Sequence, residues 1–154
     1  MRLIALLLLF ASSVTDYSGT WVLNIEKSQL GTPTPKSNVM KVEKTGPNTF
    51  LTSFDLVLAD GKEMHLNYTE TYDGQPHAIW DDGKDHPGTP KGATETCTQV
   101  NSLTRHVVGK DNGKVDMEMD SKIAPDGKTM TTRQTLFAPD GKTKEVQVFV
   151  WERQ

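Results

Sequence analysis

The sequence predicts an all-β fold, an antiparallel up-and-down meander of about 8–10 strands closed into a barrel, with at most one short helix. Asp-Gly and Asn-Gly pairs, which permit the positive φ angles of tight hairpins, recur along the chain. Between these pairs apolar and polar residues alternate with a period of two, which is typical of strands with one buried face. The expected turns lie at residues 60–61, 73–74, 82–83, 112–113, 126–127 and 140–141.

Nine strands are expected in chain order, near residues 18–25, 37–45, 49–59, 62–72, 94–100, 102–109, 113–123, 128–138 and 142–152. Several are identified by apolar side chains that share one face. These sets are Trp21, Leu23 and Ile25; Phe50, Phe54, Leu56 and Leu58; Met64, Leu66, Tyr68 and Tyr72; Val115, Met117 and Met119; and Val146, Val148 and Val150. In the last strand Phe149 and Trp151 make the opposite face apolar as well. The helical candidate is a turn or two at Glu26–Leu30, which Gly31 and the prolines after it would end.

A closed barrel accommodates these strands better than a two-sheet sandwich does. Sequential hairpins place each strand beside the next, and closure removes the exposed edges of a long sheet. An eight-stranded barrel has an interior just wide enough to be filled by side chains or to hold one small ligand. Ligand binding is therefore a candidate function.

The composition indicates a single soluble globular domain, with 35% hydrophobic and 24% charged residues. Lys and Arg number 17 against 20 Asp and Glu, giving a formal net charge of -3. This charge lacks the basic excess that binding to a phosphate backbone requires, so no nucleic-acid partner is expected. The single Cys97 cannot form an internal disulfide, and the fold has to be stable without one.

The first residues have the features of a secretory signal peptide. Met1 and Arg2 give a positive start, Leu3–Phe10 is apolar, and the small residues at 11–13 suit a signal peptidase site. The apolar run is much shorter than the roughly 20 residues that span a bilayer, so no membrane span is expected after cleavage. We therefore expect residues 1–13 to be removed, residues 14–154 to form the barrel domain, and the protein to be exported to the periplasm or secreted. The sequence does not determine the oligomeric state.

Gly19-Thr20-Trp21 opens the first strand and Trp151-Glu152-Arg153 closes the last. This pair resembles the pattern of the calycins, the lipocalin and fatty-acid-binding barrels. Together with Tyr72-Asp73-Gly74 and the 126–131 segment, it is similar to small exported bacterial lipocalin-like domain proteins. The resemblance implies that Gly19, Trp21 and Arg153 close one end of the barrel, with the Arg153 cation over the Trp21 indole.

The expected ligand is a small hydrophobic or amphipathic molecule inside the barrel. Methionines and aromatic residues make an adaptable apolar wall. The candidate lining residues are Phe54, Leu56, Met64, Leu66, Tyr68, Met117 and Met119. The same residues would also suit a solid core without a ligand. The alternatives to ligand binding are an envelope structural or protein-interaction module, and a barrel enzyme that uses His and Asp residues.

The longest irregular stretch is Asp73–Ala93, and loops of this length in compact domains usually carry function. It is a candidate lid, with His77, Trp80 and His86 as its notable side chains. No two of its His and Asp residues stand at a recognised ligand spacing, so neither a metal nor another cofactor is predicted.

A hairpin turn at Asn101-Ser102 would pair Cys97 with His106 on one face. A thiol beside an imidazole is the minimal unit of nucleophilic catalysis. The alternative is that Cys97 is a small buried residue in a β-branched strand. Because nothing in the sequence supplies an orienting group or oxyanion donors, no catalytic residue is assigned.

Overall fold

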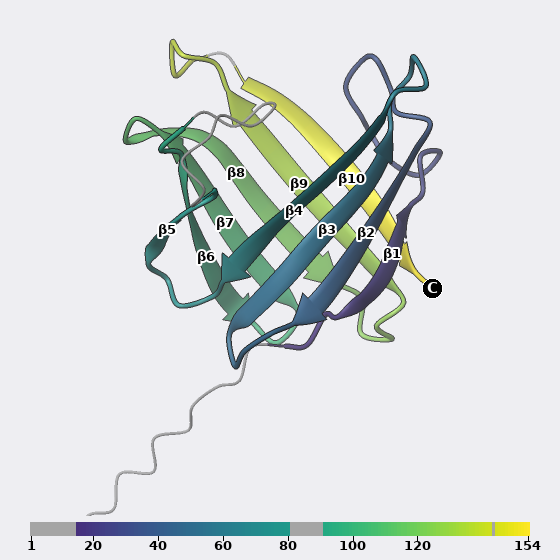
Figure 1. The fold of residues 1–154 in the computed structure, drawn as a ribbon, viewed down its shortest axis with the longest axis horizontal. Helices are drawn as coiled ribbons and strands as arrows, with labels where there is room; N and C mark the ends of the chain where they lie inside the picture. Colours follow the sequence, from purple (N-terminus) through teal and green to yellow (C-terminus); the bar gives the residue numbers. More distant parts are fainter. Residues whose placement is uncertain (1–14, 81–90, 143) are drawn as a thin grey trace, which may run out of the picture.

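The computed structural model describes residues 15–80, 91–142 and 144–154, in which ten antiparallel strands form one sheet that curls into a nearly closed barrel (Figure 1). The strands are β1 Gly19–Leu23, β2 Ser37–Lys44, β3 Thr49–Val57, β4 Glu63–Thr71, β5 Pro76–Ala78, β6 Thr94–Asn101, β7 Thr104–Asp111, β8 Lys114–Ile123, β9 Thr129–Phe137 and β10 Lys144–Arg153. No helix occurs in the described ranges, and none of their segments forms a helix long and apolar enough to cross a membrane.

The strand order is β4-β3-β2-β1-β10-β9-β8-β7-β6-β5, so the first strand pairs with the last. The sheet is open between β4 and β6, which approach each other without a strand ladder. Gly74 N donates to Cys97 O across this gap at 3.1 Å. The predicted all-β meander is confirmed, and its closure is nearly complete.

All nine predicted strands are present, and β5 is a tenth that was not predicted. It has three residues and pairs only with β6, which is too little sequence to show a period of two. It lies inside the stretch that was expected to be irregular.

The predicted short helix at 26–30 is wrong, because a hydrogen-bonded turn stands there. Asn24 Oδ1 accepts from Lys27 N at 3.0 Å, which offers the backbone a local alternative to a helix. Gln29 then exchanges both of its backbone hydrogen bonds with Val148 of β10, at 2.7 and 2.8 Å. The segment therefore rejoins the sheet.

The predicted pairing of Cys97 with His106 is wrong by one residue. Cys97 pairs with Val107, and Thr98 pairs with His106. A register irregularity between Gln99 and Asn101 shifts the hairpin, and a one-residue shift moves a side chain to the other face of the sheet. Cys97 is buried, whereas the His106 Nδ1 atom lies 2.8 Å from Asp120 Oδ1 on the outer face.

The Asp-Gly turns share one geometry at three hairpins. The aspartate at 60, 126 and 140 accepts from the backbone N–H two residues later, at 2.9, 3.0 and 2.8 Å. At the β7–β8 hairpin Asn112 and Gly113 both have positive φ, 49° and 79°, as a two-residue turn requires. Turn chemistry thus accounts for the regular spacing of the strands.

One end of the barrel, called the floor below, is the end where residues 15–18 lead into β1 (Figure 1). The Thr15 hydroxyl donates to Ser102 O in the β6–β7 hairpin, so residues 15–18 cross beneath the barrel. The Tyr17 carbonyl accepts from Trp21 Nε1 at 3.0 Å, and both side chains are buried. The expected signal peptide at 1–13 lies outside the described residues, and its removal stays a prediction.

Candidate functional site

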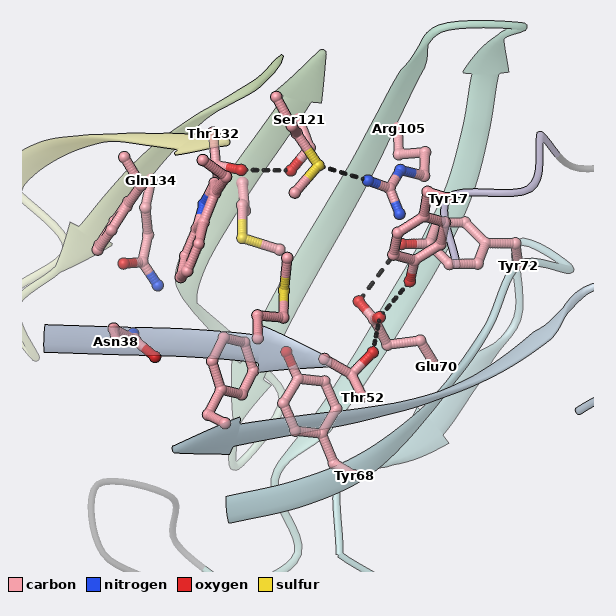
Figure 2. Close-up of a pocket in the computed structure, with 16 residues that line it drawn as sticks. Tyr17, Asn38, Thr52, Tyr68, Glu70, Tyr72, Arg105, Ser121, Thr132 and Gln134 are labelled. Atoms are coloured by element: carbon pink, nitrogen blue, oxygen red, sulfur yellow. Dashed lines mark hydrogen bonds between the residues drawn. The ribbon is translucent and has the colours of Figure 1, made fainter. Parts of the chain in front are cut away.

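The barrel encloses a cavity of about 170 Å³ above this floor (Figure 2). Its walls combine methionines and aromatic rings with a few polar side chains, as ligand sites usually do. The lining residues are Tyr17, Asn38, Met40, Thr52, Phe54, Tyr68, Glu70, Tyr72, Arg105, Met119, Ser121, Met130, Thr132, Gln134, Phe149 and Trp151. They come from β2, β3, β4, β7, β8, β9 and β10 and from the segment before β1.

The Glu70 carboxylate is the centre of a buried polar cluster at the floor end of the cavity (Figure 2). Its Oε2 accepts from the Tyr17 hydroxyl at 2.5 Å and from the Thr52 hydroxyl at 2.8 Å. Its Oε1 accepts from the Tyr72 hydroxyl at 3.3 Å. Burial, and next the Glu70 charge, raise the pKa of Tyr17 and of Tyr72 well above the ordinary value. Both phenols therefore keep their protons and act as donors.

Arg105 supplies the positive charge of the same cluster and is only 3% exposed. Its guanidinium carbon lies 3.2 Å from the centroid of the Tyr17 ring, a stacked cation–π contact. Nη2 donates to Met130 Sδ at 2.9 Å, and a thioether is a weak acceptor. Nε is buried and has no hydrogen-bond partner among the described residues. The guanidinium therefore has donor capacity that the protein leaves unused.

Further polar side chains line the cavity on β8, β9 and β2. The hydroxyls of Ser121 and Thr132 are 2.9 Å apart and hydrogen-bonded. Asn38 reaches both this cavity and a second pocket of about 360 Å³ at the mouth, and its Oδ1 is buried without a partner in the described residues. Phe149 also lines both spaces, so the cavity and the mouth pocket adjoin at these two residues.

Glu95 and Cys97 are buried on the inner side of β6, beside the cavity wall. Burial, and next the Glu70 charge, raise the pKa of Glu95 to about 8. The acid is therefore mostly neutral at pH 7. Burial and the Glu95 carboxyl raise the pKa of the Cys97 thiol well above its ordinary range. A thiol held protonated in this way is a poor nucleophile.

The expected lining residues fall into four groups. Phe54, Tyr68 and Met119 line the cavity, and Leu56 lines the mouth pocket. Met117 packs against the core. Met64 and Leu66 are half-buried on the face of β4 that also carries Tyr68 and Glu70, and they line neither space.

The three residues expected to close the barrel lie together at the floor. Trp21 is completely buried, and the Arg153 guanidinium carbon stands 4.5 Å from the centroid of its ring. Gly19 has φ +131°, a conformation that other residues rarely adopt, and its position faces the Arg153 side chain. The arrangement brings the start of β1 beneath the end of β10.

The residues of the expected lid do not lie together. The Trp80 ring meets the Tyr68 ring edge to face at a centroid distance of 6.2 Å, so it packs against a residue of the cavity wall. His77 Nε2 lies 3.0 Å from Asp73 Oδ1 at the outer surface. His86 lies outside the described residues. Within the residues that are described, no group of three or more His, Cys, Asp or Glu side chains is arranged to hold a metal ion.

Sequence reasoning missed the charged residues of the site. Glu70 lies between Tyr68 and Tyr72 on an alternating face, and Arg105 lies two residues before the buried Val107. A charge at an inward position of a period-two pattern was the available signal. Tyr17 carried no such signal, because it enters the barrel from outside any strand.

The comparisons with known proteins support the fold. No protein-family model matches this sequence, and no curated protein is significantly similar to it. Wild-type UnaG, a fluorescent protein, is similar with a TM-score of 0.59 and 14% identity, over 89% of this chain and 96% of UnaG. A point mutant of UnaG gives 0.58 and 14%, over 89% and 95%. The siderocalin Ex-FABP gives 0.47 and 12%, over 90% and 74%. The UnaG matches show that this chain has the calycin-like β-barrel fold.

Proposed function

We propose that this protein is an exported barrel that binds a small, largely hydrophobic molecule in its interior. The observation that carries the proposal is the cavity above the floor, which joins an apolar wall to a buried polar cluster. A solid core would fill this space, since protein interiors are normally packed without voids larger than a water molecule. The unused donors of Arg105 are a second support, because buried polar groups are normally satisfied.

The mouth pocket supplies the route to the cavity. It is lined by residues 30–33, Pro35, Leu56, Leu58 and part of β10, and adjoins the cavity at Asn38 and Phe149. Apolar side chains of this pocket favour entry of an apolar molecule from the end of the barrel opposite Trp21.

The first test is native mass spectrometry of the protein purified from its source envelope or medium. We expect the chain to carry a bound small molecule and to begin at Val14, the residue after the proposed cleavage site. The proposed processing leaves Tyr17 in the mature chain, where it forms the floor. A chain that keeps residues 1–13 would contradict the export part of the proposal.

The second test is titration with 4-fluorotoluene, a small apolar probe, followed by fluorine NMR. Gln134 is half-buried and lines the cavity, so Gln134→Trp should fill it and weaken binding by about tenfold or more. The matched control is Arg133→Trp, because Arg133 is its exposed neighbour on the outer face of β9. This control should bind the probe as the unchanged protein does.

Two results would overturn the binding function. One is a chain without any copurified molecule that also binds neither 4-fluorotoluene nor a ring of the same size that carries a hydrogen-bonding group. The other is equal binding by Gln134→Trp and the unchanged protein, which would place the probe outside the cavity.

A further inference from the structure

Arg105 is a buried cation whose Nε donor has no acceptor among the described residues. The stacking on Tyr17 occupies one face of the guanidinium and leaves its N–H groups free to point along the plane. One of them reaches the Met130 sulfur and another is hydrogen-bonded to Tyr72, whereas the Nε donor reaches no acceptor in the described part of the chain. Arg105 lines the cavity, so an acceptor on a bound ligand can receive a hydrogen bond from its guanidinium, whereas an aliphatic ligand offers no acceptor.

The charge of Arg105 is already balanced. Glu70 and Arg105 are the two charged residues among those that line the cavity, and they are linked through Tyr17. The guanidinium carbon lies over the Tyr17 ring. The Tyr17 hydroxyl donates to the carboxylate (Figure 2). A ligand with a negative charge would therefore leave an unbalanced anion in the interior, which is costly in a low dielectric.

The other ionisable groups packed around the cavity add no positive charge. Tyr17, Tyr68 and Tyr72 are held neutral by burial, which raises the pKa of each. Glu95 on β6 has a pKa of about 8 and is mostly neutral at pH 7. Cys97 on the same strand is held as the thiol. None of these groups can compensate an incoming anion.

The size of the cavity limits the ligand further. Its volume is about 170 Å³. An apolar cavity of about 150 Å³ is known to accept benzene, so this one takes about one substituted ring unless the ligand extends into the mouth.

We infer that the ligand is an uncharged molecule of about one ring that presents a hydrogen-bond acceptor to Arg105. This inference rests on the proposed function and names the chemical class for the same cavity. The Glu70–Tyr17–Arg105 cluster determines the specificity, because it binds a neutral acceptor more tightly than a carboxylate of the same size.

Three probes of similar size separate the possibilities: 4-fluoroacetophenone, a neutral acceptor; 4-fluorobenzoate, an anion; and 4-fluorotoluene, which has no acceptor. Fluorine NMR titration of the full chain at neutral pH gives the affinity of each. We expect the neutral acceptor to bind the unchanged protein about tenfold or more tightly than the anion.

Removing the negative charge of Glu70 should change the preference of the cavity for the neutral probe over the anionic one. Glu70→Gln keeps one oxygen that can accept from Tyr17 and Thr52, turns the other acceptor into an amide donor facing Tyr72, and leaves Arg105 unbalanced. The affinity for 4-fluorobenzoate should therefore rise about tenfold. The matched control is Glu63→Gln, because Glu63 is an exposed residue of the same strand. It removes one negative charge without touching the cavity, and the preference should not change.

A second variant tests Arg105 while keeping the interior neutral. In the double variant Arg105→Met with Glu70→Gln, 4-fluoroacetophenone should lose about tenfold in affinity, while 4-fluorotoluene should change less than about twofold. Near-ultraviolet circular dichroism shows whether each variant keeps its tertiary packing.

Three results would contradict different parts of these proposals, and the first needs only the unchanged protein. Binding of 4-fluorobenzoate as tightly as 4-fluoroacetophenone would refute the neutral ligand class and leave the binding function standing. Unchanged 4-fluoroacetophenone binding by a folded double variant would remove Arg105 from recognition. Failure of all three probes to bind would instead overturn the proposed function itself.

Discussion

The two ends of the barrel are built differently. At the floor Tyr17, Trp21 and Phe50 are at most 2% exposed, and their rings pack against one another and against charged side chains. Toward the mouth, Leu30, Leu56 and Leu58 are only half-buried in the wall of the mouth pocket. Apolar side chains that remain open to solvent contribute less to stability and leave access to the interior. The floor therefore holds the fold together, and the mouth admits a ligand.

The two buried glutamates show the same contrast. Glu70, near the floor end of β4, accepts hydrogen bonds from three hydroxyl groups. Glu95, at the start of β6 nearer the mouth, has an Oε1 atom that finds no partner in the described residues. Its side chain is hydrogen-bonded to Cys97, but burial outweighs this contact and favours the neutral acid. The floor end of the cavity is thus organised around the Glu70 carboxylate, whereas Glu95 on β6 is a neutral acid at pH 7.

The largest expected effect comes from removing the floor. Trp21→Ala deletes a completely buried ring together with its hydrogen bond to Tyr17 O, and should lower the free energy of unfolding by about 3–5 kcal/mol. Leu56→Ala in the half-buried wall of the mouth pocket should cost only about 1 kcal/mol. Urea unfolding followed by circular dichroism measures both. A loss below about 0.5 kcal/mol for Trp21→Ala would refute its structural role.

The sequence predicted most of the fold because hairpin turns and alternation are local signals. The strands followed from these signals, and so did the inward positions of Phe54 and Tyr68. The β6–β7 register did not, because the irregularity between Gln99 and Asn101 depends on how the hairpin closes. The turn at 26–30 was taken for a helix because the pairing of Gln29 with Val148 joins residues far apart in sequence.

The site was harder to predict than the fold. Arg105 and Glu70 have the residue types expected on a solvated face, and only their positions in the alternating pattern show that they point inward. Tyr17 precedes the first strand and is placed by contacts with distant residues of β4 and β7. A polar cluster assembled from three separate segments leaves no local motif in the sequence.

The next effect is a pH dependence that comes from Glu95. Its pKa is about 8 in the fold against 4.5 as the ordinary value, so the folded chain keeps a proton that the unfolded chain has lost in this interval. The free energy of unfolding should therefore fall by about 1.4 kcal/mol per pH unit from this group as pH rises between these values. Below the interval both states are protonated, and above it both are ionised, so the contribution is constant there.

Glu95→Gln should remove this slope. The variant should match the unchanged protein near pH 4.5, the ordinary value, and should become the more stable of the two by about pH 8. Urea unfolding of both proteins across this range gives the difference, in which the other titrating groups cancel. Parallel curves for the two proteins would mean that Glu95 is ionised in the fold.

The smallest expected effect comes from Arg153, whose guanidinium lies over the buried Trp21 ring. Arg153→Ala keeps the buried Trp21 ring and removes the guanidinium 4.5 Å from its centroid, so the loss should be about 0.5–2 kcal/mol. Arg153→Lys keeps the charge but not the planar group, and should recover only part of this loss. Urea unfolding measures each variant beside Trp21→Ala. If Arg153→Ala cost as much as Trp21→Ala, the guanidinium rather than the buried ring would be the main element that closes the floor.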